Sequence, residues 1–523
     1  MKSLYIISAL FLLNGCGSFT RTEYQRPELT LPQQWDDKIH QSGANDVVTS
    51  VQSLNLTENW WDNFKDPQLS QLINQVLENN NDLAAAAIKL KLARSTAGLA
   101  NTNITPNVSL GGSASNTKSI RNGTSPQESY SSNLNLNYEV DLWGKLARIR
   151  EKNEWEAIAT EQDYHATALV VINTTAQLYW NIALLNQQID NLIASQKIAE
   201  KSQQQIKSWY LAGKVSQLDF LQSQQTVISR KNELRRIIKE RDSSRNALAL
   251  LLNRPAEQHA SELTALNRNQ RIEILNATPL SVLAQRPDIQ AAESRLRSAL
   301  ADSDAAKLSF YPTLSLQGAL NAGSQLFSQW FSDPTRVVGG SISLPFIQWN
   351  TVKLTIEQSD LQVQQAAVAF RRAAYTALSE VDNAMEARFA ADEIRQQLQQ
   401  SLSLSQQRLK LTSSRYRAGA ANYQTLLNAQ DDLLTIENTL AQNQYDYLYA
   451  TLQLWLAQGG GSARQEDNPL WTKNLTLNAL LSQAMGLSLH WGIRLQHVGK
   501  RLWIKSSVIV TLIKLRKIST VIF

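Results

Sequence analysis

The sequence predicts a mostly α-helical protein with a smaller β part, built from one unit that occurs twice. Three observations predict it. The same residue types recur 206 positions apart, from Asp82 and Asp288 to Leu250 and Leu456. Two long stretches contain no proline and one glycine each. Two shorter stretches alternate apolar and polar residues. A repeat of this length indicates a duplicated structural unit. The stretches without proline indicate long helices, and the alternation of apolar and polar residues indicates strands.

The bulk properties bound the class of protein. Hydrophobic residues make up 43% and charged residues 18% of the 523 residues, which excludes a disordered chain. No run of about 18 apolar residues follows the N-terminus, so we expect no transmembrane helix in the mature chain.

The N-terminus has the layout of a secretory signal, expected at 1–15. Lys2 precedes the short apolar run 4–13, which ends at Cys16. The residues before Cys16 resemble a bacterial lipobox, in which the cysteine is lipidated and becomes the first mature residue. Cys16 is the only cysteine and cannot form an internal disulfide. By the same resemblance, Gly17 favours sorting to the outer membrane. A plain signal peptide that is cut elsewhere is the alternative.

The repeat divides the rest into a first unit at 16–270 and a second at 271–461. Each unit starts with a helix of small residues. Pro106 ends this helix in the first unit and Pro312 ends it in the second. The expected strand pairs then lie at about 104–140 and about 310–346.

The strand pairs alternate in hydrophobicity. The residues expected on one face are Leu134, Leu136, Tyr138 and Val140 in the first unit, and Val338, Gly340, Ile342, Leu344 and Phe346 in the second. Alternation over about 10 residues is typical of a membrane barrel strand with lipid outside and water inside. A half-buried strand of a soluble sheet gives the same pattern.

Long helical hairpins are expected at 145–254 and 350–458. Proline is absent from 127 to 254 and from 346 to 468, and Gly213 and Gly419 are the only glycines inside the two hairpins. A helix from 145 to 210 would be about 100 Å long. Each glycine marks the turn, because glycine reaches a positive φ at little cost.

Two units supply only four strands, so the sheet of a single chain has two open edges whose backbone groups are unpaired. Hydrocarbon does not tolerate unpaired backbone groups, and a closed membrane barrel needs about 8 strands. The sequence therefore requires an oligomer if the strands span a membrane.

Five motifs together resemble the TolC-like outer-membrane factors, in the lipoprotein (NodT/OprM-like) branch that serves resistance-nodulation-division efflux pumps. They are WWDNFKDPQLSQLI at 60–73, YEVDLWGKLARIR at 138–150, WYLAGKVSQLDFLQSQ at 209–224, QRPDIQAAESRL at 285–296 and RYRAGAANYQTLLNAQ at 415–430. The resemblance implies a homotrimer with a 12-stranded transmembrane β-barrel in the outer membrane, continued by a long periplasmic α-helical barrel. It implies an exit duct for drugs or other small toxic compounds, which an inner-membrane transporter and a periplasmic adaptor deliver.

The resemblance also assigns the two glycine turns to a periplasmic tip that forms the aperture and meets the adaptor. The candidate residues are Tyr210, Gly213, Ser216 and Asp219 at the first turn, and Tyr416, Gly419, Asn428 and Asp431 at the second. Relatives often carry charged gate residues after the second turn, where this chain has Ala421, Thr425 and Asn428. We therefore expect Asp219 or Asp431 to carry more of the polar constriction. A turn with solvated flanks is the plainer interpretation.

The sequence shows no catalytic signature. It has no HExxH, cysteine pair, P-loop or GxSxG motif. We therefore expect no enzyme, no cofactor and no resident metal. Two other functions remain open at this point, an exit duct for secreted polypeptides and a coiled-coil lipoprotein scaffold without transport.

The tail at 462–523 departs from the repeat. Its last part, 485–523, contains seven lysines and arginines and no acid, so it accounts for the formal charge of +6. That charge does not indicate a nucleic-acid partner. The tail is either a basic membrane-surface segment or, as we favour, an altered reading frame or unusual extension.

Overall fold

Long helices dominate the part of the chain that the structure describes. The computed structural model describes residues 21–30, 59–118, 125–267, 270–272 and 284–460. They belong to the first of two units, Met1–Ala463. The expected signal segment, Cys16 and the tail at 462–523 lie outside the described residues.

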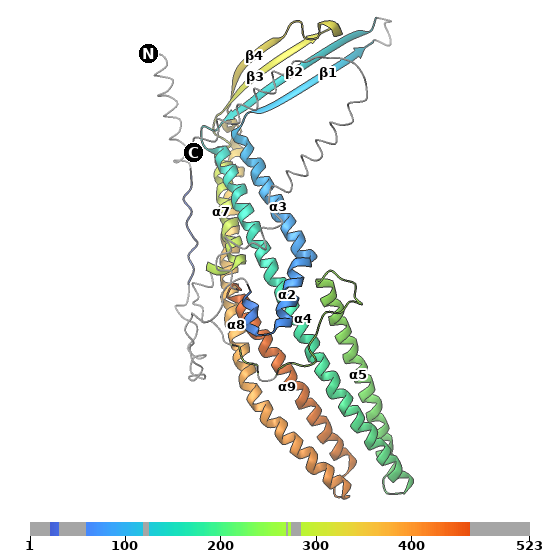
Figure 1. Ribbon diagram of the computed structural model, residues 1–523. Coiled ribbons are helices and arrows are strands. Elements are labelled where there is room, and N and C mark those ends of the chain that lie inside the picture. The colour runs from blue at the N-terminus through green and yellow to red at the C-terminus, as the bar shows by residue number, and fades with distance from the viewer. Residues whose placement is uncertain (1–20, 31–58, 119–124, 268–269, 273–283, 461–523) are drawn as a thin grey trace. The chain divides into compact units, whose positions relative to one another are not determined.

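Two helical hairpins follow the two strand pairs (Figure 1). In the first, α4 spans Lys145–Leu211 and α5 spans Gln217–Leu251. In the second, α8 spans Trp349–Arg417 and α9 spans Tyr423–Ala457. With 67 residues in α4 and 69 in α8, each of these helices is about 100 Å long. The long helices that the proline-free stretches predict are therefore present.

Two shorter helices, α3 (Asn81–Asn101) and α7 (Pro287–Leu308), continue the returning helices α5 and α9. The Asn80 side chain donates to the Leu251 carbonyl at 3.1 Å, and Arg286 donates to the Ala457 carbonyl at 3.1 Å. These carbonyls have no partner within their own helix. Each repeat thus contains one unbroken helix and one helix in two pieces.

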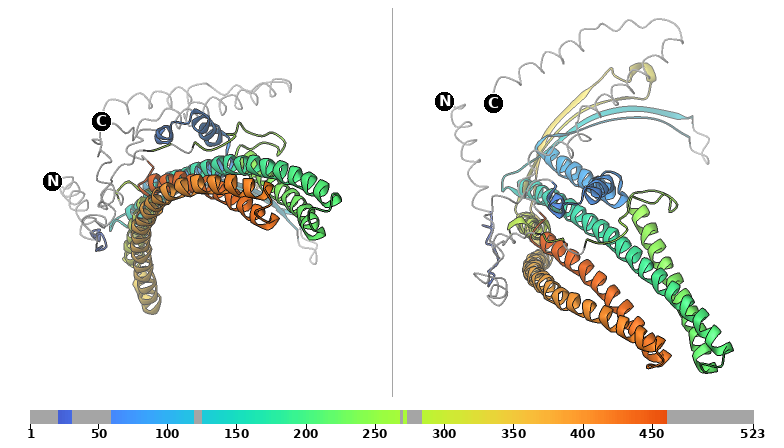
Figure 2. Two further views of the ribbon diagram at one scale, coloured as in Figure 1. Left: turned by 90° about the horizontal axis from the view of Figure 1, so that it is seen from below. Right: turned by 60° about the horizontal axis from the view of Figure 1, so that its bottom comes forward.

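The helices lie side by side as an arc (Figure 2). α4 packs on α3, α5, α7 and α9, and α8 packs on α7 and α9. The outer faces of α3 and α8 have no comparable neighbour within the described ranges. They carry exposed apolar residues spaced four or seven positions apart: Ile88, Leu92 and Leu99 on α3, and Leu354, Leu361 and Val368 on α8. Stripes of this kind are typical of helix–helix seams between chains.

The four strands form one antiparallel sheet in the order β1-β2-β3-β4. β1 spans Asn107–Thr117, β2 Gln127–Val140, β3 Thr313–Ser324 and β4 Thr335–Ser343. The two repeats meet in the centre, where Leu134 of β2 pairs with Leu320 of β3. Among the described residues no strand pairs with the outer edge of β1 or of β4, so the sheet is open as the strand count predicts.

Residues paired across antiparallel strands share a face. One face of this sheet is mostly apolar and the other is mostly polar, with Arg336 and Val337 as the exceptions on β4. The apolar face carries Val108, Leu110, Leu134, Leu136, Tyr138, Leu314, Leu316, Leu320, Val338 and Ile342. The polar face carries Ser109, Ser113, Asn133, Asn135, Asn137, Ser315, Gln317, Asn321 and Ser341. Leu110 is 79% and Val338 is 78% exposed, so no protein core covers the apolar face in the described part. A lipid-facing surface fits this exposure better than a soluble sheet does.

One strand prediction is wrong in part. Leu344 and Phe346 were expected to continue the apolar face, but β4 ends at Ser343 and Pro345–Ile347 forms a 3-10 turn. Proline fixes φ and has no N–H to donate to a neighbouring strand.

A second packing layer covers the convex side of the arc, where Figure 2 shows α2 (Pro67–Asn79). The preceding turn, Trp60–Phe64, stacks Trp60 on Trp455 of α9 at 5.8 Å and sets Phe64 against Trp180 of α4 at 5.0 Å. One stretch of α4 is apolar enough to cross a membrane by composition, but 61% of it is buried inside the protein. Packing in this core explains its composition.

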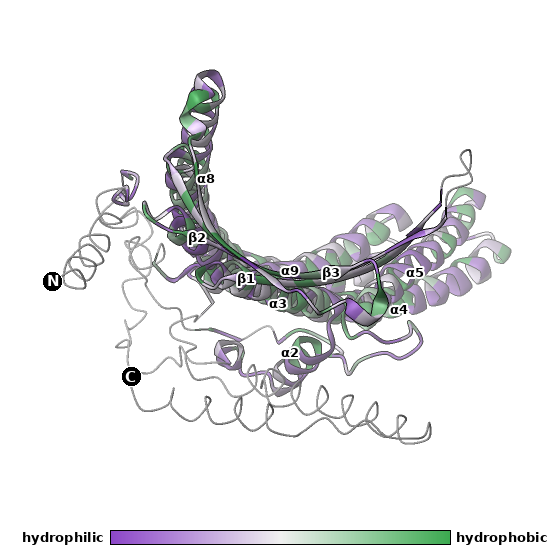
Figure 3. Cartoon of the chain, turned by 90° about the horizontal axis from the view of Figure 1, so that it is seen from above, coloured by the Kyte–Doolittle hydropathy of each residue, from purple (hydrophilic) through white to green (hydrophobic). Residues whose placement is uncertain are grey.

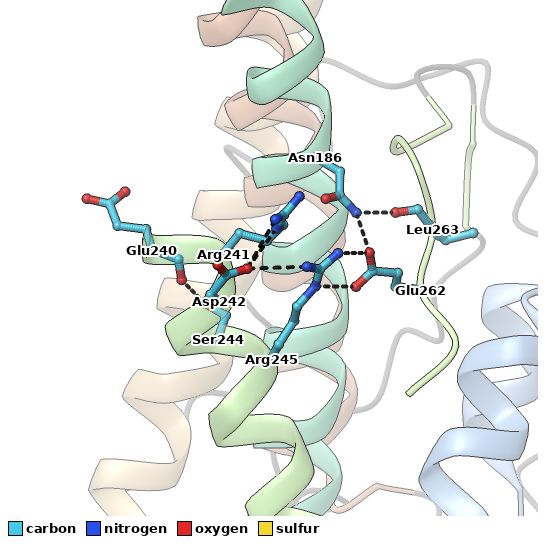
Figure 4. A network of polar contacts seen from close by, with 8 residues as sticks. All are labelled: Asn186, Glu240, Arg241, Asp242, Ser244, Arg245, Glu262 and Leu263. Carbon is cyan, nitrogen blue, oxygen red and sulfur yellow. Dashed lines mark hydrogen bonds and ion pairs between the residues drawn. The ribbon is translucent and has the colours of Figure 1, made fainter. Parts of the chain in front are cut away.

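A polar network fastens the linker between the repeats to the first hairpin (Figure 4). Glu262 of the linker accepts hydrogen bonds from Arg245 of α5 and from Asn186 of α4. The Asn186 side chain also donates to the Leu263 carbonyl at 2.9 Å. These contacts hold the linker near the end of α5 that is remote from the turn.

The core on the convex side predicts a large effect for one substitution. Phe64→Ala should lower the free energy of unfolding by about 3–5 kcal/mol, because it empties a site that is 1% exposed. Thermal loss of helical circular dichroism in detergent would measure it. Phe331→Ala, at a phenylalanine that is 68% exposed, is the control and should change it by about 0.5 kcal/mol or less. Equal effects would contradict this account of the core.

Candidate functional site

The far ends of the two hairpins have matching turns. Gly213 and Gly419 both have positive φ, +69° and +72°. In the first turn the Lys214 N–H donates to the Trp209 carbonyl at 2.8 Å, and in the second the Ala420 N–H donates to the Arg415 carbonyl at 2.8 Å. This is the Schellman end of a helix, with glycine in the left-handed position. A Cβ would meet no atom within 4 Å at either glycine, so the backbone conformation alone requires glycine there.

A side-chain cap starts the returning helix after each turn. Ser216 and Asp219 form a reciprocal capping box at the start of α5. Asn422 caps α9 by accepting from the Thr425 N–H at 2.9 Å. Both caps occupy matching positions of the repeat. The Asp219 carboxylate, which together with Asp431 was a candidate for the polar constriction, has a local role as a helix cap in this chain.

Aromatic rings join the two hairpins near their ends. The Tyr416 ring lies 5.5 Å from Trp209 of α4 and 6.0 Å from Tyr423 of α9. Tyr416 is only 9% exposed, and burial raises the pKa of its hydroxyl to about 12. Tyr210, its counterpart in the first repeat, instead stacks on Phe220 of its own hairpin.

A charge pair joins the hairpins about two to three helical turns further from the tip than these rings. Asp431 of α9 forms an ion pair with Arg230 of α5. Burial raises the pKa of Asp431, and the positive charge of Arg230 opposes this rise. Asn428 is exposed and accepts a hydrogen bond from Gln424 at 2.7 Å.

The candidate residues thus fall into three groups. Tyr416 and Asp431 lie at the contact between the hairpins. Tyr210, Gly213, Ser216 and Asp219 build the first turn, and Gly419 builds the second. Asn428 lies on an exposed face of α9. Sequence reasoning missed Trp209, Tyr423 and Arg230. The repeat offset from Ser216 would have found the Asn422 cap, but no sequence signal links Arg230 to Asp431.

An extended strap at residues 21–30 lies along α7 and α8. The Thr22 N–H and hydroxyl both donate to the Asp304 carboxylate, at 2.9 and 2.6 Å. Asp304 is 3% exposed. The guanidinium of Arg297 stacks on the Tyr24 ring at 4.3 Å, and Arg26 pairs with Glu293. The strap begins five residues after Cys16 in the sequence.

Side chains that could hold a metal do not converge within the described ranges. No group of three or more histidine, cysteine, aspartate or glutamate residues is placed there to bind an ion. Burial lowers the pKa of His165. This histidine lies on α4, and its ring contacts the ring of Tyr164.

Comparison with known proteins identifies the family. A family model described as outer membrane efflux protein matches residues 72–254 and 279–460, one match in each repeat. Toxin and drug export protein A of Aggregatibacter actinomycetemcomitans is 29% identical over 413 residues, or 78% of this chain and 90% of that protein. The probable outer membrane lipoprotein SilC of Salmonella typhimurium is 25% identical over 460 residues, or 88% of this chain and 98% of that protein.

A solved structure shows the same fold. The open state of the MtrE outer membrane channel of Neisseria gonorrhoeae matches with a TM-score of 0.73 and 25% identity, covering 86% of this chain and 99% of that chain. The predicted fold class, a β-barrel continued by an α-barrel, is thereby confirmed. Channels of this family are homotrimers that work with an adaptor and an inner-membrane pump. The chain belongs to the outer membrane efflux protein family, and it is an outer-membrane exit channel of a tripartite efflux pump.

Proposed function

We propose that this channel passively conducts drugs and other small toxic compounds and has no catalytic activity of its own. The observation that carries the proposal is the sheet with one apolar and one polar face, joined directly to two hairpins of about 100 Å. In a trimer the polar faces would line a water-filled passage that continues between the helices. Such a passage supplies no energy, so the partner pump must drive the transport.

The cargo is tested by deleting the gene. We expect a strain without this chain to lose resistance to dyes, detergents or antibiotics, and a plasmid copy to restore it. One relative is named a toxin and drug export protein, which favours toxin export as a second candidate. Unchanged resistance together with loss of an exported toxin would support that candidate and overturn the first.

We propose that the hairpin ends form the aperture and meet the adaptor. The Arg230–Asp431 pair and the Tyr416–Trp209 contact tie the second hairpin to the first within one subunit. An aperture opens only if the hairpins move apart, so these contacts favour the closed state. In this proposal Asp431 restrains the aperture through its ion pair, whereas Asp219 serves to start α5.

Removing the tie should open the aperture. Arg230→Ala should raise the single-channel conductance of the purified channel in planar bilayers severalfold. Arg408→Ala is the matched control, because its ion pair with Asp432 joins α8 and α9 within one hairpin. An unchanged conductance in Arg230→Ala, or an equal rise in both variants, would contradict the proposed role.

We propose that Cys16 carries lipid and that the strap holds this anchor against the helices. Asp304→Ala removes the acceptor of both Thr22 hydrogen bonds. We expect trypsin to cleave after Arg21 at least about tenfold faster, because the open strap becomes more populated. Mass spectrometry of the released fragment would also show whether Cys16 is acylated.

The matched control for the strap is Asp302→Ala. Asp302 lies on the same helix but is only half-buried and pairs with Lys152. Its loss should leave the cleavage rate unchanged. Equal acceleration in both variants would mean that a general loosening of α7, rather than release of the strap, exposes the site.

A further inference from the structure

A cavity lies where the two-piece helix of the second repeat is interrupted. It has a volume of about 700 Å³ and lies between α4, α7, α8 and α9. α9 ends at Ala457 and α7 begins at Pro287 on its border.

The cavity faces the concave side of the arc. On α9 it is lined by Asp446, Ala450, Gln453 and Ala457. The residues Tyr447, Leu448, Leu452 and Trp455 belong to the core under the Trp60 turn and α2. At 3.6 residues per turn these two sets centre on opposite faces of the helix. Tyr449 and Leu456, which also line the cavity, lie between the two faces and pack against the core. Figures 2 and 3 show α2 on the convex side, so the cavity opens toward the side that a closed barrel encloses.

The charges of the cavity are unbalanced. Its lining includes three carboxylates, Asp288, Glu380 and Asp446, and one cationic side chain, Arg286. The Arg286 guanidinium already pairs with Asp288 at 2.8 Å and with Glu380 at 2.7 Å. It also donates to the Ala457 carbonyl. One cation thus faces three anions, and its donors are engaged.

Asp446 has the weakest compensation of the three carboxylates. It accepts a hydrogen bond from Gln442 at 2.9 Å, and no ion pair to it is present within the described residues. Asp446 is exposed at the surface of the cavity, and partial desolvation by the surrounding side chains raises the pKa of its carboxyl. A positive charge in the cavity would stabilise its ionised form.

The remaining wall is apolar and aromatic. Leu169, Val170 and Leu456 line it together with several alanines. The Tyr449 ring, stacked parallel to Tyr445, adds an aromatic surface that can contact a cation. An apolar wall with a few convergent charged groups is typical of sites for small organic molecules, and about 300–1,000 Å³ is their usual size.

We propose that this cavity is a docking site for amphipathic organic cations inside the channel. The proposal deepens the proposed function and rests on it, because it names a cargo class for the same passage. Asp446 supplies the main charge contact, and the apolar wall covers the hydrophobic part of the molecule. Binding must be weak enough for release, as in any conducting pathway.

The test measures dye binding to the purified full-length channel in lipid nanodiscs. Fluorescence polarisation should show binding of the cation rhodamine 6G and little binding of the anion fluorescein. Asp446→Asn should weaken rhodamine binding by about tenfold, as loss of a charged contact does. Ala450→Trp should abolish it by filling the cavity while Asp446 is retained.

Asp432→Asn on the same helix is the control, since Asp432 lies outside the cavity and pairs with Arg408. It should bind rhodamine 6G like the unaltered protein. Each variant must migrate as the native trimer. Undiminished binding in Ala450→Trp, equal binding of fluorescein, or no binding at millimolar dye would overturn the proposal.

The binding result and the cellular result can fail separately. If no dye binds but deletion of the gene abolishes dye resistance, the exit function stands and the docking site is refuted. If dye binds with the expected variant pattern but deletion leaves resistance unchanged, the site stands and the cargo assignment is refuted.

Discussion

The open edges of the four-stranded sheet are the constraint on which the rest of the structure depends. Backbone N–H and C=O groups cannot remain unpaired in hydrocarbon, and β1 and β4 each have an outer edge without a partner in the described chain. Closure by further copies satisfies both edges. The same closure would also bury the apolar stripes on α3 and α8, so strands and helices point to one mode of assembly.

Because of the duplication, each chain supplies two similar parts of the barrel wall. Two units with the same strand pair, long helix and two-piece helix form similar parts of one wall, and three chains repeat that wall to complete a barrel. The two units are not identical at their tips. Tyr210 faces outward on its own hairpin, whereas Tyr416 is buried between the hairpins. In the proposed aperture, this asymmetry would let the first hairpin hold the second.

The sequence predicts the local features well because they depend on neighbours along the chain. Proline and glycine positions locate α4, α5, α8 and α9, and the glycines at 213 and 419 locate the turns. The alternation predicts the two faces of β2 correctly, but it places the end of β4 too late, beyond Pro345. Alternation describes side chains only and does not show that proline lacks a backbone N–H. Contacts between distant segments were not predictable. Arg230 and Asp431 are 201 residues apart, and the Thr22–Asp304 clasp joins positions 282 residues apart. No local pattern specifies which charges meet.

The central claim is that the hairpin tips face a periplasmic partner of a closed duct. Lys214→Cys tests it most directly, because Lys214 is an exposed turn residue outside both caps and Cys16 is the only native cysteine. Crosslinking in living cells, followed by mass spectrometry, should capture a periplasmic adaptor at the new thiol. Labelling of that thiol by a membrane-impermeant maleimide added outside the cells, with no periplasmic protein captured, would contradict the account.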